Sequence, residues 1–148
     1  MQVIKDSLAR EINETNILMN VAAQKRHYMA EVLQIEDRDL LEEKVETAEE
    51  AIFEQEEKIR ALPYLKKNIE HCDSPYLAVK LSDLVKDIEA DIEQTTVNTR
   101  TIHMHLEIYE LALSCELKDA LTALDADTAK KAKKIEALQK ALDALSIY

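Results

Sequence analysis

The sequence of 148 residues contains no glycine and only two prolines, Pro63 and Pro75. Glycine supplies the positive φ values of tight turns and left-handed helix caps, and it lets a backbone approach bound phosphates closely. Its absence argues against βαβ junctions and excludes glycine-rich nucleotide loops. Alanine, leucine, glutamate, lysine and isoleucine dominate instead, and this composition is typical of long helices. We therefore predict an all-α fold.

Long apolar runs are missing as well. About 20 consecutive apolar residues are needed to span a bilayer, and the apolar runs of this chain are only a few residues long. No N-terminal segment combines basic residues, an apolar run and a small-residue cleavage site, the pattern of a secretory signal. Cys72 and Cys115 are too few for a disulfide framework, so we expect free thiols. These features predict a soluble, cytoplasmic protein with no membrane partner.

Positive charge is scarce over most of the chain. The net charge is −11, and residues 126–148 hold five lysines against three acidic residues. The other 125 residues therefore carry −13. A field of that sign repels phosphate backbones and anionic membranes. We predict no direct binding to nucleic acid.

Helical periodicity runs through nearly the whole chain. Apolar or small residues recur at steps of three and four, which is the repeat of a helix with one buried face. We predict a single domain that forms an elongated bundle of four long helices, over residues 2–36, 39–71, 75–123 and 127–146. The stripe of the longest helix comprises Leu77, Leu81, Leu84, Ile88, Ile92, Thr95, Thr99, Ile102, Leu106, Tyr109, Leu113, Leu117, Ala120 and Leu124.

The predicted helix ends follow from capping residues. Asp39, followed by Glu42, matches the reciprocal capping pattern at the start of a helix. Ser74 before Pro75 suits the start of the next helix, because the first helical position needs no N–H donor. Pro63 is expected to kink the 39–71 helix, since its ring clashes with the preceding turn.

Residues 41–62 carry a coiled-coil seam. Its members alternate between steps of four and three, a 3.5-residue period, and are Leu41, Val45, Ala48, Ile52, Gln55, Ile59 and Leu62. Gln55 is the one polar position. A seam of this regularity predicts self-association as a homodimer, with Leu41, Val45 and Ile52 as candidate partner-binding residues.

No catalytic constellation is evident in the sequence. His71 and Cys72 are adjacent, so on a helix their side chains point about 100° apart and cannot act as a pair. The Glu-x-x-His spacing of di-metal bundles is absent, because Gln24, Asn68, Arg100 and Ile102 occupy the position three residues before each histidine. The weak metal-ligand candidates are His27 with Glu31, and His103 with Glu107. We predict no enzyme activity, no cofactor and no metal.

Two rows of carboxylates could form interaction surfaces. One row includes Glu46, Glu49 and Glu50, and the other is Asp83, Asp87 and Asp91. Like charges at this spacing destabilise a helix mildly, so they serve solubility, lysine partners or a basic target. The leading interpretation is a non-enzymatic scaffold or adaptor with an unidentified protein partner. The alternative is an acidic inhibitor that imitates DNA, as some small viral proteins do, in the basic cleft of a nucleic-acid-handling protein. The third is a metal-binding helical bundle.

Overall fold

The computed structural model describes residues 1–147, apart from the side chains of residues 95–97. This part of the chain is α-helical nearly throughout and contains no strand. Its helices are α1 (Gln2–Leu33), α2 (Arg38–Glu70), α3 (Pro75–Leu113) and α4 (Leu117–Leu145). The predicted all-α class is confirmed.

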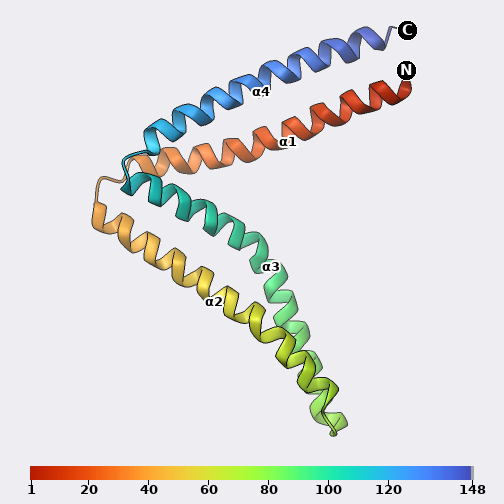
Figure 1. The fold of residues 1–148 in the computed structure, drawn as a ribbon, viewed down its shortest axis with the longest axis vertical. Coiled ribbons are helices and arrows are strands. Elements are labelled where there is room, and N and C mark those ends of the chain that lie inside the picture. Colours follow the sequence, from red (N-terminus) through yellow and green to blue (C-terminus); the bar gives the residue numbers. More distant parts are fainter. Residues whose placement is uncertain (148) are drawn as a thin grey trace. The chain divides into compact units, whose positions relative to one another are not determined.

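The chain divides into two compact units. Unit 1 comprises Met1–Glu36 and Leu111–Tyr148 and contains α1 and α4, whereas unit 2 comprises Asp37–Glu110 and contains α2 and most of α3. Within each unit the two helices lie side by side and run antiparallel (Figure 1). Each unit therefore packs as a pair of antiparallel helices, which we call a hairpin below.

The negative charge belongs almost entirely to unit 2. Its residues include 19 acidic and 9 basic side chains, a net charge of −10, against 11 acidic and 10 basic side chains in unit 1. The two units therefore differ in the partners that their surfaces attract at long range.

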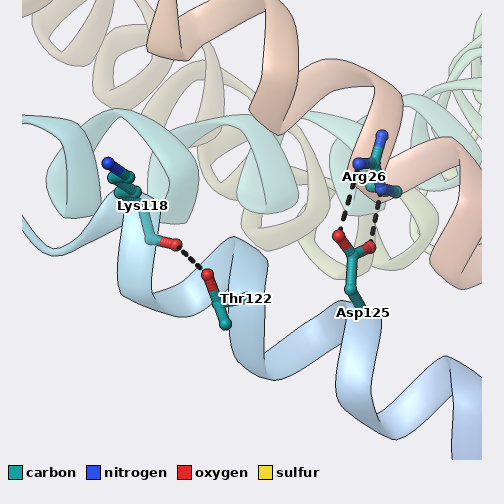
Figure 2. A network of polar contacts seen from close by, with 4 residues as sticks. All are labelled: Arg26, Lys118, Thr122 and Asp125. Carbon is teal, nitrogen blue, oxygen red and sulfur yellow. Dashed lines mark hydrogen bonds and ion pairs between the residues drawn. The ribbon is translucent and has the colours of Figure 1, made fainter.

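In unit 1, α1 packs against α4. The buried side chains of this unit include Met29 and Val32 of α1 and Leu117 of α4. The Arg26 guanidinium forms a bidentate pair with the Asp125 carboxylate, through Nε–Oδ1 at 2.6 Å and Nη2–Oδ2 at 3.3 Å (Figure 2). This hydrogen bond and the carboxylate charge raise the pKa of Arg26. Because both side chains are about half exposed, the pair defines the register of the two helices more than it stabilises them.

The predicted boundary between the last two helices is wrong. The helix predicted over 75–123 ends at Leu113, and the helix predicted over 127–146 begins at Leu117. The predicted gap between these helices, at residues 124–126, lies inside α4. There Asp125 pairs with Arg26, and the neighbouring Asp127 pairs with Lys131 at 2.6 Å.

A left-handed cap ends α3. Cys115 has φ = 62°, the Glu116 N–H donates to the Leu111 carbonyl at 2.9 Å, and the Cys115 N–H donates to the Ala112 carbonyl at 3.2 Å. This is the hydrogen-bond pattern of a Schellman motif, in which glycine normally occupies the left-handed position. Here cysteine occupies the left-handed position, so the sequence lacks the glycine that would have indicated the end of this helix.

Replacing Cys115 with glycine is expected to raise the free energy of unfolding by about 1 kcal/mol, because glycine has no Cβ to clash in this conformation. Urea denaturation followed by circular dichroism measures the change. Cys115→Ala is the matched control: it also removes the thiol but keeps the Cβ, and should give no such gain. Equal stabilities for the two variants would contradict the account.

The ends of α2 and α3 correct one predicted cap and confirm another. Asp37, not Asp39, caps α2, and its carboxylate accepts hydrogen bonds from the Asp39 and Leu40 amides at 3.0 and 3.3 Å. Ser74 caps α3 as predicted, since its hydroxyl accepts from the Leu77 amide at 3.4 Å. Pro63 does not end α2, which extends past it to Glu70.

Candidate functional site: exposed faces of the helices

The predicted seam of α2 is buried inside unit 2. Leu41, Ala48 and Gln55 are at most 8% exposed, and Val45 and Ile52 are half-buried. The seam faces α3: the Thr99 hydroxyl donates a hydrogen bond to the Gln55 side-chain oxygen. The apolar periodicity thus identified a buried face, but α3 of the same chain covers it. A dimer would need a different surface.

Three contacts show how the α2–α3 pairing is oriented. Thr99 lies 2.5 Å from the Gln55 oxygen, the Lys58 ammonium lies 3.0 Å from Asp91, and the Lys66 ammonium lies 2.6 Å from Glu89. Gln55 is 5% exposed, so its hydrogen bond satisfies a group that would be costly to bury alone. A single buried polar pair of this kind fixes the register of two helices.

A groove of about 420 Å³ runs along unit 2. It is lined by Leu40, Glu43, Lys44, Thr47, Ala48, Ala51, Ile102, His105 and Tyr109. The volume suits a small ligand or a few side chains of a partner. The Lys44 ammonium lies 5.9 Å from the centre of the Tyr109 ring, within the range of a cation–π contact.

His105 is the titratable group of most interest in this groove. Partial burial lowers its pKa below the ordinary value of 6.5, so the imidazole is neutral at pH 7. Its ring centre lies 6.4 Å from that of Tyr109. Thr47 and Lys44 also line the groove. The groove offers an apolar surface with a polar rim, suited to binding.

The candidate acidic residues are exposed, and one of them is paired. Glu46, Glu49 and Glu50 lie on the exposed side of α2, and Asp83 and Asp87 on that of α3. Asp91 pairs with Lys58, so it is partly neutralised within the unit. The remaining carboxylates contribute to the strongly negative surface of unit 2.

The weak metal candidates do not form a metal site. His27 Nε2 lies 2.9 Å from the Glu31 carboxylate, and both side chains are more than half exposed. His103 and Glu107 are exposed on α3. Among the residues that the structure describes, no group of three histidine, cysteine or acidic side chains could hold a metal ion. The His27–Glu31 contact is a surface pair between neighbouring turns of a helix.

Exposed apolar side chains form faces that the sequence interpretation missed. On α1, Ile17, Leu18 and Val21 are 54–56% exposed. On α2, Phe53 is 55% and Tyr64 is 73% exposed. Their spacing is helical, but each lies outside the main apolar stripe and among polar residues. In the sequence, apolar residues outside the main stripe give only a weak signal, because single apolar residues are common on protein surfaces.

Comparisons with known proteins give no match for this chain. No protein-family model matches the chain, and no curated protein or solved structure matches it. Within the described residues, no helix has the length and apolar character required to cross a membrane.

Proposed function

We propose that this protein is a non-enzymatic scaffold or adaptor that binds a protein partner through exposed helical faces. The observation that supports it is the face formed by Ile17, Leu18 and Val21, called the α1 patch below. The buried face of α1 is already covered by α4, yet these three apolar side chains remain more than half exposed. Adjacent exposed apolar residues on a helix suit the packing of a partner helix or groove.

Affinity capture from host lysate tests this role. The Leu18→Glu variant is expected to lose the partner that the wild-type chain captures, because a carboxylate in an apolar contact is left without a partner. Asn20→Glu is the matched control, since it adds the same charge at an exposed position two residues away. Circular dichroism checks that both variants remain helical. Equal capture by both variants would contradict the role of the α1 patch.

The second candidate function is an acidic inhibitor that occupies a basic cleft of a nucleic-acid-handling protein. The concentration of a net −10 charge in unit 2 favours it, together with exposed carboxylates such as Glu46, Glu49 and Asp87. Binding of this kind should weaken steeply with salt, and duplex DNA should compete for the same target. Persistence at high salt would exclude it.

The proposal includes a cytoplasmic location and self-association. Free thiols at Cys72 and Cys115 support a reducing compartment. Coiled-coil-like packing within a four-helix bundle and a homodimer are parts of the same proposal. Because the α2 seam faces α3, the homodimer requires another exposed face.

A further inference from the structure

The exposed face of α2 opposite its seam has a charge pattern that reverses along the helix. Its positions follow one another at steps of three and four and are therefore aligned on one side. They are Glu42, Glu46, Glu49, Phe53, Glu57, Arg60, Tyr64 and Lys67, all exposed. We call this row the α2 ridge. Its first half is acidic and ends at Phe53, and its second half carries Arg60, Tyr64 and Lys67, with Glu57 between the two halves.

A ridge of this kind is complementary to itself when two copies run antiparallel. The acidic half of one helix then faces the basic half of the other, and the same contacts occur twice around a twofold axis. A parallel arrangement would instead place Glu46 and Glu49 against their own copies. In the antiparallel pair, only Glu57 among the carboxylates of the ridge lies near its own copy. The charge pattern therefore favours a second copy as the occupant and an antiparallel direction.

The structure also contains a hollow that can receive Phe53, the aromatic residue at the centre of the ridge. Glu57, Arg60, Ala61 and Tyr64 line a shallow hollow of about 390 Å³ on the surface of α2. These four positions are i, i+3, i+4 and i+7, the set that forms a hole for a side chain of a facing helix. Ala61 has only a methyl group as its side chain, so it leaves room in the hollow for a larger side chain of the facing helix. Phe53 is 55% exposed, one turn before this hollow.

We propose that the protein forms a symmetric homodimer through antiparallel α2 ridges, with Phe53 of each copy in the hollow of the other. This rests on the proposed protein-binding role and names its partner as a second copy of the chain. Seating Phe53 opposite Arg60 and Ala61 fixes the register of the two helices. Arg60 then stacks on the Phe53 ring, a favoured cation–aromatic contact.

The same register matches the polar residues on either side. It places the Glu46 carboxylate opposite the Lys67 ammonium, and the Glu49 carboxylate opposite the Tyr64 hydroxyl, which can donate to it. Within the described part of the chain, Glu46, Glu49 and Lys67 have no ion-pair partner. The contacts between the two copies therefore break no existing ion pair. An aromatic centre with a charged rim is the composition of many stable interfaces.

Sedimentation equilibrium of the full-length chain tests the proposal. The wild-type protein is expected to dimerise, and Glu46→Lys or Lys67→Glu alone should raise the dissociation constant by roughly tenfold or more, because each places like charges together twice. The double variant Glu46→Lys/Lys67→Glu should restore wild-type affinity. Lys86→Glu, an equal charge change at an exposed position of α3, should have no effect. A monomeric wild type, or a double variant no better than the singles, would overturn the proposal.

Disulfide crosslinking tests the direction of the helices. In a Cys72→Ser/Cys115→Ser background, Glu57→Cys should crosslink two copies, because residue 57 lies next to the twofold axis. Glu46→Cys should not, since it faces residue 67 of the other copy. A parallel pair would crosslink at residue 46 as well as at residue 57, so a crosslink through Glu46→Cys would refute this interface. A monomeric chain that still captures a partner through Leu18 would refute the dimer alone, whereas a dimer without such capture would refute the adaptor role alone.

Discussion

Replacing Leu117 with alanine is expected to lower the free energy of unfolding by about 2–5 kcal/mol. Leu117 is 2% exposed at the first turn of α4, and its truncation removes buried methyl groups and leaves a cavity that the surrounding helices fill only partly. The effect should be large because each unit is a hairpin with few fully buried side chains, so one such residue is a substantial part of its core.

Urea denaturation followed by helical circular dichroism measures this loss. The matched control is Leu18→Ala, which makes the same chemical change at a position 54% exposed on α1 and should shift the free energy by no more than about 0.5 kcal/mol. If the Leu117 variant were as stable as the Leu18 variant, the packing described for unit 1 would be wrong.

The second large effect is expected for Leu41→Glu, which should destabilise the fold by about 3–5 kcal/mol. Leu41 is 5% exposed on the α2 face that packs on α3. The substitution removes an apolar contact and places a carboxylate in a buried position, where its desolvation is costly. From the sequence alone, the same change is expected to abolish association with a partner.

The neighbouring residue provides the control for that prediction. Leu40 is 39% exposed, so Leu40→Glu can keep its carboxylate in water and should cost about 1 kcal/mol or less. The urea midpoints of the two variants can be compared directly. A Leu41→Glu protein that retained wild-type stability and only failed to self-associate would show that the seam faces a second copy after all.

The sequence predicts the buried faces in part but not what covers them. Ile59 of the seam and Leu77 and Leu84 of the next stripe are 46–52% exposed. The seam positions Leu41, Ala48 and Gln55 are buried as its heptad spacing indicates. Helical periodicity indicates that a face of a helix is buried, but it does not indicate which apolar surface covers that face. Only the tertiary structure shows that α3 takes this place and that Thr99 pairs with Gln55.

The missed break between α3 and α4 has a specific physical cause. Helix ends are recognised in sequence by proline, glycine or a capping residue, and Ser114–Glu116 contains neither of the first two. Cys115 adopts a left-handed conformation that its residue type does not announce. Asp125 and Asp127, at the predicted boundary, lie within α4, where their carboxylates pair with Arg26 and Lys131.

Only part of the candidate site could be predicted from the sequence. The acidic residues Glu46, Glu49 and Glu50 are exposed, as a solvated or partner-facing row requires. The α1 patch and Phe53 were not predicted, because an apolar residue outside the main stripe gives no periodic signal strong enough to separate it from ordinary surface variation. Their significance comes from exposure, which only the structure measures.

The most direct test of the proposed role is the salt dependence of the dissociation constant between this chain and the partner that it captures. Binding through the apolar α1 patch predicts a nearly flat dependence on salt concentration, no competition by duplex DNA, and loss of affinity in Leu18→Glu but not in Asn20→Glu. A dissociation constant that rises steeply with salt, with DNA as a competitor and no sensitivity to Leu18, would contradict the adaptor and establish the acidic inhibitor in its place.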